Sequence, residues 1–253
     1  MLLAIDIGNS YTKFGIFESS TLIDKFSIPT ARDYSTDELL FDRLKRNGER
    51  FLSIDTVAAS SVVPELNETF RQALKKLLNV TPIFIDHTCD FGLKIDYDPP
   101  GSLGVDRLVI ASAAAAKFGA PAIACSFGTA TTFNAVDADS EFLGGAIAPG
   151  IRTMAESLHW KTSRLPLVEI EKPGSVLGRS TEDSIEAGVY TGHAGMVDRI
   201  LSAIFDEMSA RPKVVATGGF AKIVAAESRL IDVVDEDLTL DGIRMITERT
   251  AGT

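Results

Sequence analysis

A carboxylate followed by a short polar turn lies near the start of the chain. Asp6 ends an apolar, strand-like run, and Gly8 introduces a turn with Asn9 and Ser10. A carboxylate at such a position can hold Mg²⁺ through water, and the ion then neutralises phosphate oxygens. The side chains of Asn9, Ser10 and Lys13 can donate hydrogen bonds to β- and γ-phosphates, and the glycine lets the backbone approach them. The same residues also fit an ordinary strand–turn–strand with exposed polar tips.

A second turn of this kind occurs about 120 residues further along the chain. The segments AIDIGNSYT and ACSFGTATT align so that Gly8 falls on Gly128 and Thr12 falls on Thr132. Such self-similarity indicates related structural units, so we expect two lobes that face each other. Two such turns can hold a polyphosphate between them, with backbone N–H groups and the Thr129 hydroxyl as donors. A sheet turn lined with β-branched residues is the alternative for the second segment.

Two glycines end the later strand-like run VVATGG. Gly218 and Gly219 precede a short helical pattern, and their lack of side chains lets a flat ring lie against the backbone. We interpret them as a shelf for adenosine. A plain turn at the entry to a helix accounts for them equally well.

An Asp-Arg pair stands at the start of an alanine-rich segment, GVDRLVIASAAAA. Ser102 is a candidate N-cap for a helix there, and this cap would place Asp106 and Arg107 in the first helical turn. An acidic residue in the first turn is favourable through the helix dipole alone, whereas a cation there is mildly unfavourable. An acceptor pocket explains both residues, because Asp106 can take the proton of an attacking hydroxyl and Arg107 can orient the substrate.

The overall composition limits the partners and the compartment of the protein. Its 253 residues are 45% hydrophobic, enough for one large core or two modest ones, and the formal net charge is −10. Acidic charge spread along the chain disfavours nucleic acid or an anionic membrane as a partner. Cys89 and Cys125 make no disulfide framework, and the three scattered histidines make no zinc motif. No apolar run has the length of a signal-peptide core or a membrane span, so we expect a cytoplasmic protein.

The hydrophobic pattern predicts β-β-β-α-β-α-β in the first half of the chain and begins the same pattern again in the second half. Ser35 and Glu38 form a capping box that begins the first helix, and Gly48 ends it. In the first half we predict strands at 2–6, 11–17, 20–28, 56–63 and 81–86 and helices at 35–48 and 64–78. In the second half we predict strands at 121–127, 131–136, 142–148, 213–219 and 230–234 and helices near 151–158, 181–208 and 240–249.

The ordered set of motifs resembles the acetate and sugar kinase/Hsp70/actin superfamily, and within it the type III pantothenate kinase family. The resemblance runs over nearly the whole chain and is carried by DIGNSYTK, SSVVP, GVDR, GTATT, GGAIAPG, the Thr181 region and TGGFA. It implies an α/β fold of two ribonuclease H-like lobes with a cleft between them. We expect the lobes at 1–117 and 118–253, with the last helix either in the second lobe or packed back on the first.

The resemblance implies transfer of the ATP γ-phosphate to the primary hydroxyl of pantothenate, the first step of coenzyme A synthesis. It implies Asp106 as the general base and Asp6 as the second catalytic carboxylate, which holds Mg²⁺ through water. The family is generally homodimeric and uses a monovalent cation, K⁺ or NH₄⁺. The implied ATP-binding residues are Asp6, Ile7, Gly8, Asn9, Ser10, Tyr11, Thr12, Lys13, Gly128, Thr129, Gly218 and Gly219, and the implied pantothenate-binding residues are Tyr97, Gly104, Val105, Asp106, Arg107 and Thr181.

Two positions depart from the family pattern. Ser126 stands where the family usually has the aspartate that helps to hold the monovalent cation, and Asn134 replaces a later aspartate. A hydroxyl is a poorer cation ligand than a carboxylate, so the K⁺ requirement of this chain is in question. The departures also motivate an alternative, a non-catalytic nucleotide-binding relative that acts as a regulator or binds a partner. A third alternative keeps the kinase and changes the acceptor to another small hydroxy compound.

Overall fold

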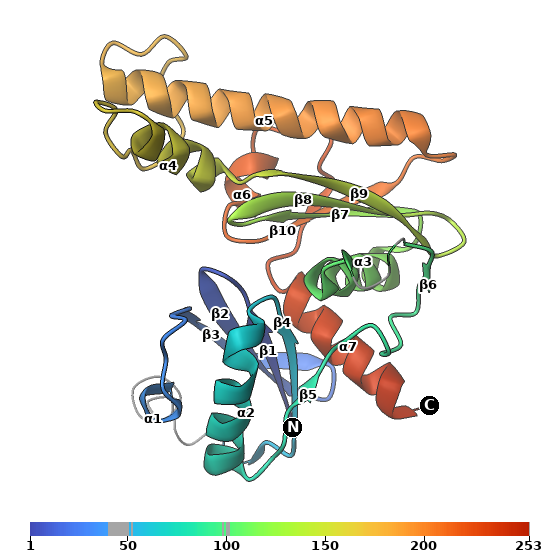
Figure 1. Ribbon diagram of the computed structural model, residues 1–253. Helices are drawn as coiled ribbons and strands as arrows, with labels where there is room; N and C mark the ends of the chain where they lie inside the picture. The colour runs from blue at the N-terminus through green and yellow to red at the C-terminus, as the bar shows by residue number, and fades with distance from the viewer. Residues whose placement is uncertain (40–50, 52, 98, 100–101, 253) are drawn as a thin grey trace. The chain divides into compact units, whose positions relative to one another are not determined.

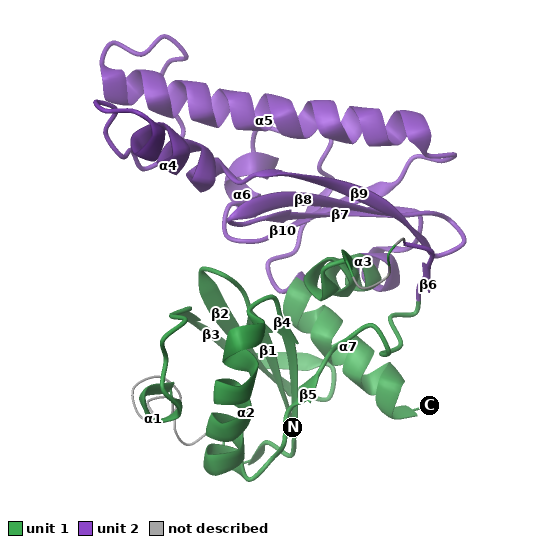
Figure 2. Cartoon of the chain, in the orientation of Figure 1, with its two compact units in different colours: residues 1–92, 98–113, 239–253 green, residues 93–97, 114–238 purple. Residues whose placement is uncertain are grey.

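The computed structural model describes residues 1–39, 51, 53–97, 99 and 102–252 and contains two sheets with helices in a mixed α/β architecture (Figure 1). The chain divides into two compact units (Figure 2). Unit 1 holds residues 1–92, 98–113 and 239–253, and unit 2 holds residues 93–97 and 114–238. The sequence-based division into domains at residue 117 stays a prediction.

Unit 1 is built on a five-stranded sheet with the order β3-β2-β1-β4-β5. The central strand β1 is antiparallel to β2 and parallel to β4, and most of its apolar side chains are buried. The predicted strands agree with the observed ones within two residues at each end. The strands are β1 (Leu2–Ile7), β2 (Tyr11–Glu18), β3 (Thr21–Pro29), β4 (Thr56–Ser61) and β5 (Ile83–Phe84).

Two helices of unit 1 begin where the sequence predicted. The capping box of Ser35 and Glu38 is present at α1 (Thr36–Glu38), while the predicted continuation to Gly48 lies outside the described residues. Helix α2 (Pro64–Leu78) starts with proline in its first turn and runs along the sheet of unit 1 (Figure 1). Its buried apolar residues join the side chains of β1 and β2 in a single core.

The helix that carries Asp106 begins later than predicted. Helix α3 (Val105–Phe118) starts directly after Gly104, so the prediction of Ser102 as its N-cap was wrong. The Ser102 hydroxyl instead donates to the carbonyl oxygen of Pro99 at 2.8 Å. Asp106 nevertheless lies in the first turn, as predicted. In unit 1 the first part of α3 packs tightly on α7 (Leu238–Gly252), where a Cβ at Gly242 would lie 2.6 Å from a carbonyl oxygen of α3.

Unit 2 repeats the strand order of unit 1 and adds one strand. Its sheet has the order β11-β10-β7-β8-β9-β6, so the run from β9 to β11 matches the run from β3 to β5. The added strand β6 pairs with β9 over two residues, too short a segment to give a sequence pattern. The strands are β6 (Lys94–Ile95), β7 (Ala122–Phe127), β8 (Ala130–Val136), β9 (Glu141–Pro149), β10 (Lys213–Thr217) and β11 (Val233–Val234).

Helices α4 (Ile151–Lys161), α5 (Thr181–Glu207) and α6 (Ala221–Ala225) belong to unit 2 (Figure 2). Val197 and Leu201 of α5 pack with α6 on the apolar face formed by β7, β8 and β10. Cys125 lies fully buried in this core, and burial raises the pKa of its thiol, which agrees with the predicted inert thiol. None of the helices in the described part of the chain is long and apolar enough to cross a membrane.

The two hairpins that carry the polar turns differ by one residue. In unit 1 the pair that closes the turn is Ile7 and Thr12, and in unit 2 it is Phe127 and Thr131. The second turn is therefore shorter, and the structural counterpart of Thr12 is Thr131. The predicted alignment of Thr12 with Thr132 was therefore wrong. It assumed a constant spacing between the two copies, and this spacing changes where the second turn lacks one residue.

Candidate active site

The hairpin of β1 and β2 presents a tight turn at one end of the unit 1 sheet. The Gly8 N–H donates to the carbonyl oxygen of Tyr11 at 3.2 Å, and a Cβ at residue 8 would lie 2.9 Å from that oxygen. Asn9, Ser10 and Tyr11 are exposed. Exposed polar tips fit both a phosphate site and an ordinary hairpin, so the neighbouring charges decide between them.

Asp6 is a partly buried carboxylate at the end of β1, directly opposite Lys13 on β2. Burial raises its pKa to about 6, the Lys13 charge lowers that pKa, and the nearby charge of Asp106 raises it. In an ordinary hairpin, a charged carboxylate that burial destabilises more than the neighbouring lysine stabilises it would only lower the stability of the fold. A divalent cation would supply the missing positive charge. The residues present therefore fit Mg²⁺ at Asp6.

Asp106 is the second carboxylate of unit 1. Burial raises its pKa, against the backbone N–H and the guanidinium charge of Arg107, which lower it. Arg107 is itself buried, with 7% of its surface exposed. A Cβ at Gly104 would lie 2.5 Å from a carboxylate oxygen of Asp106, so any residue other than glycine would displace this carboxylate. Gly104, Val105, Asp106 and Arg107 stand together at the start of α3, and their role as a contact of pantothenate stays a prediction.

Sequence reasoning missed the segment that supports the first turn. The Thr30 N–H donates to the carbonyl oxygen of Ser10 at 2.9 Å, and the hydroxyls of Thr12 and Thr30 lie 2.9 Å apart. Arg32 donates to the side-chain oxygen of Asn9 at 3.4 Å. These residues reach the turn because β2 pairs with β3, and no local motif gives that signal.

The second polar turn lies in unit 2, at the first turn of α4. The carbonyl oxygen of Thr129 accepts hydrogen bonds from the Gly150 N–H at 3.1 Å and the Thr153 hydroxyl at 2.6 Å. A Cβ at Gly150 would collide with the carbonyl oxygen of Gly128 and lie 2.7 Å from that of Thr129. The motif GGAIAPG therefore supports the turn through its last glycine. Gly128 is half-buried, whereas Thr129 is exposed.

Gly218 and Gly219 stand between β10 and α6, as predicted, and they differ in their surroundings. Gly218 has φ +98°, and a Cβ there would lie 2.6 Å from the carbonyl oxygen of Phe127. No atom of the described residues would lie within 4 Å of a Cβ at Gly219, which is exposed. Gly218 is therefore required by the fold, and Gly219 leaves open space at the end of the strand.

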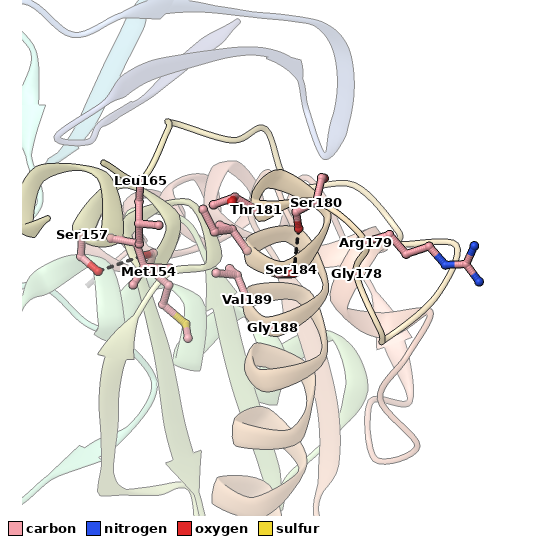
Figure 3. Close-up of a pocket in the computed structure, with 12 residues that line it drawn as sticks. Met154, Ser157, Leu165, Gly178, Arg179, Ser180, Thr181, Ser184, Gly188 and Val189 are labelled. Atoms are coloured by element: carbon pink, nitrogen blue, oxygen red, sulfur yellow. Dashed lines mark hydrogen bonds between the residues drawn. The ribbon is translucent and has the colours of Figure 1, made fainter. Parts of the chain in front are cut away.

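A pocket of about 850 Å³ in unit 2 has Thr181 in its lining (Figure 3). Its polar side chains include Ser157, Ser180 and Ser184, while Arg179 extends away from the other labelled side chains (Figure 3). The Ser180 hydroxyl accepts from the Asp183 N–H and caps α5, which fixes the start of the helix beside Thr181. The apolar lining comes from α4, α5 and the loop between them, namely Met154, Leu158, Leu165, Ile185 and Val189.

Tyr97 is the remaining predicted contact of pantothenate. It lies in unit 2, two residues after the end of β6, and is half-buried. Its ring meets the Phe142 ring edge-on at a centroid distance of 6.1 Å.

The predicted site residues fall into two groups. The first turn and the Gly104–Arg107 arrangement belong to unit 1, and Tyr97, Thr181, the second turn and the glycine pair belong to unit 2.

Ser126, the position predicted for a monovalent cation, has strand partners that carry hydroxyl groups. Ser126 on β7 pairs with Thr132 on β8 and with Thr217 on β10. The Asn134 amide nitrogen donates to the carbonyl oxygen of Ala124 at 3.1 Å and to the Thr132 hydroxyl at 3.2 Å. Among the residues with described positions, no group of three or more His, Cys, Asp or Glu could hold a metal ion. These residues do not fit a cation site that depends on a carboxylate.

Known structures share the fold of this chain. A conserved Baf family protein from Campylobacter jejuni has a TM-score of 0.62 at 20% identity, over 99% of this chain and 100% of that one. An inorganic polyphosphate/ATP-glucomannokinase from Arthrobacter sp. strain KM has a TM-score of 0.51 at 13% identity, over 100% of this chain and 99% of that one. The two-lobed sugar kinase fold predicted from the motifs is confirmed.

Sequence relatives identify the family. The chain is 41% identical to a type III pantothenate kinase of Koribacter versatilis, over 98% of this chain and 96% of the relative. It is 42% identical to a type III pantothenate kinase of Brevibacillus brevis, over 98% of this chain and 99% of the relative. The family model described as type III pantothenate kinase matches residues 2–203. The chain therefore belongs to the type III pantothenate kinase family.

Proposed function

We propose that the chain phosphorylates the primary hydroxyl of pantothenate with ATP and forms 4′-phosphopantothenate and ADP, the first step of coenzyme A synthesis. The observation that carries the proposal is the family match over residues 2–203, which includes both carboxylates, Asp6 and Asp106. Relatives of the same name cover 98% of the chain at 41% and 42% identity. These names favour pantothenate over another small hydroxy compound as the acceptor.

Asp106 is the proposed general base. It accepts the hydroxyl proton of pantothenate while the hydroxyl oxygen attacks the γ-phosphorus, and the β–γ bridging oxygen leaves with ADP. A raised pKa makes the carboxylate a stronger base than an exposed aspartate. Arg107 follows it in the same helical turn and offers a fixed positive charge for orienting the acceptor.

The first turn and Asp6 are the proposed site of the ATP phosphates. Mg²⁺ held by Asp6 through water would neutralise the phosphate oxygens. Lys13 adds a second positive charge on the neighbouring strand. Thr129 in the second turn is the proposed contact with the phosphate chain, and the open space at Gly219 would admit the adenosine ring.

The pocket around Thr181 is the proposed contact of pantothenate in unit 2. Hydroxyl groups on an apolar floor match a ligand with amide and hydroxyl groups on a branched hydrocarbon frame. Tyr97 is the second proposed contact in this unit. Both assignments come from the family resemblance, and the pocket supports them with a lining of suitable chemistry.

A homodimer and a cytoplasmic location are further parts of the proposal. The family resemblance suggests the homodimer, and Trp160 (76% exposed) and Leu177 (83% exposed) are large apolar side chains that a subunit contact would cover. Trp160→Glu should therefore convert a dimer to a monomer in sedimentation, whereas Ile23→Glu on the exposed side of β3 should not.

The proposed cytoplasmic location agrees with the state of the two cysteines. Cys89 and Cys125 are free, and free thiols suit a reducing compartment.

The decisive experiment measures formation of phosphopantothenate from ATP and pantothenate with Mg²⁺. Asp106→Asn should lower kcat by roughly 10²–10⁴-fold, because the amide cannot accept the proton. Asp139→Asn removes an exposed carboxylate in the turn between β8 and β9 and should leave kcat unchanged. A wild-type chain that binds ATP without turnover would instead be the non-catalytic relative. An Asp106→Asn variant as active as the wild type would remove the proposed base.

A further inference from the structure

A buried histidine touches the residues that close the second polar turn. His193 lies on α5 with 1% of its surface exposed. Its Nε2 atom is 2.9 Å from the Thr131 hydroxyl oxygen in a fully buried contact. Its ring meets the Phe127 ring edge-on at a centroid distance of 6.2 Å. Because Phe127 and Thr131 form the pair that closes the turn, one imidazole contacts the residue on either side of it.

The surroundings of His193 determine its protonation. Burial lowers its pKa to about 4, so the imidazole is neutral at physiological pH. Among the described residues, nothing forms a hydrogen bond with its buried Nδ1 atom. A neutral imidazole has one N–H and one bare nitrogen, and a buried N–H without a partner is the rarer and more costly arrangement. Nε2 therefore carries the proton and donates a hydrogen bond to the Thr131 hydroxyl oxygen.

We propose that His193 is a positioning residue of the ATP site, which fixes the Phe127–Thr131 pair and through it the backbone of the turn from Gly128 to Ala130. The start of α4 already holds this turn, because the Gly150 N–H and the Thr153 hydroxyl donate to the Thr129 carbonyl oxygen. His193 on α5 holds the pair of residues that closes the turn. The inference rests on the proposed function only in assigning this turn to ATP.

The experiment compares His193→Gln, His193→Asn and His193→Phe. The glutamine amide nitrogen can reach the place of Nε2, the asparagine amide is too short for it, and phenylalanine fills the volume without a hydrogen bond. The measured quantities are the Kd for Mg²⁺·AMPPNP by calorimetry and the kinetic constants for both substrates. We expect His193→Phe and His193→Asn to weaken AMPPNP binding and raise the KM for ATP by roughly tenfold, the loss of about one buried hydrogen bond.

Rescue and coupling separate positioning from simple packing. His193→Gln should bring the Kd for AMPPNP back to within about threefold of the wild type. The KM for pantothenate should stay unchanged in all three variants. Thr131→Val should weaken AMPPNP binding as His193→Phe does, and combining the two should add little, because both remove the same hydrogen bond.

Three results would overturn the proposal. The first is an unchanged Kd for AMPPNP in a folded His193→Phe chain, which would leave His193 a packing residue. If His193→Phe fails to fold, equal Kd values for the glutamine and asparagine variants would have the same meaning. The third is a wild type that does not bind AMPPNP, which also removes the proposed function. A wild type that binds AMPPNP but makes no phosphopantothenate defeats the proposed function alone, because the calorimetric comparison still stands.

Discussion

Lys13 lies directly opposite Asp6 on the antiparallel pair of β1 and β2, one position before the Ile7–Thr12 pair that closes the first turn. The lysine charge lowers the pKa of Asp6, yet burial outweighs it, and the pKa remains near 6. The site therefore holds a carboxylate that its own neighbours do not fully stabilise in the charged form. A Mg²⁺ ion that arrives with ATP would complete the charge balance.

The first prediction concerns the stability of Asp6→Asn without Mg²⁺ or ATP. The pKa of Asp6 is about 6 in the folded chain against an ordinary value of 3.8, so the folded chain binds the proton more tightly. The charged carboxylate thus lowers the free energy of unfolding above pH 6, by up to about 3 kcal/mol, and has no such effect below pH 4. Asp6→Asn should raise Tm at pH 8, and the gain should shrink as the pH falls from 6 to 4.

The matched control for this prediction is Glu18→Gln. Glu18 is an exposed carboxylate at the other end of β2, and its removal should change Tm little at either pH. Asp6→Asn should also abolish turnover while it stabilises the fold. A Tm that falls at pH 8 in Asp6→Asn would mean that the carboxylate stabilises the folded chain, contrary to this reasoning.

The second prediction separates the two glycines after β10. Gly218→Ala should lower the free energy of unfolding by about 1–3 kcal/mol, because the new Cβ meets the Phe127 backbone at a positive φ. Gly219→Ala should leave Tm unchanged, since its Cβ enters open space. If adenosine occupies that space, Gly219→Ala should raise the KM for ATP and leave the KM for pantothenate unchanged. If Gly219→Ala leaves the KM for ATP unchanged, the two glycines form only a turn at the entry to a helix.

The third prediction tests how Gly104 places the Asp106 carboxylate. A Cβ at Gly104 would lie 2.5 Å from a carboxylate oxygen of Asp106 and displace it. Gly104→Ala should lower kcat by roughly 10–100-fold, because a small displacement of a catalytic group is costly. Gly174→Ala is the control, since its Cβ would meet no described atom within 4 Å. Full activity in a folded Gly104→Ala chain would argue against Asp106 as the base.

The fourth prediction concerns monovalent cations. Because Ser126 replaces a carboxylate by a hydroxyl and its strand partners Thr132 and Thr217 add only hydroxyls, turnover in Na⁺, K⁺ and NH₄⁺ at equal ionic strength should be similar. Ser126→Asp restores a carboxylate, and K⁺ should then raise both its Tm and its rate relative to Na⁺. Thr132→Ser keeps a hydroxyl and should respond to cations as the wild type does. Strong K⁺ activation of the wild type would show that neutral oxygens suffice at this position.

Local patterns in the sequence were enough for the order and bounds of most elements. Pro64 begins α2, and the capping box of Ser35 and Glu38 begins α1. Strand β6 had no signal, because a two-residue pairing has no period to detect. The start of α3 was misplaced because Ser102 makes its hydrogen bond to Pro99 instead of capping the helix, an alternative that serine has in any loop.

The sequence by itself determined the family, the alternation of strands and helices, and the residues able to do chemistry, because these depend on residue types and short spacings. Only the tertiary structure decided which distant residues support them. Thr30 reaches the first turn through strand pairing, and His193 reaches Thr131 across 62 residues of chain. The pKa of Asp6 likewise depends on burial and on Lys13 and Asp106. Desolvation and contact arise from the packing of segments far apart in the chain, and no local pattern encodes them.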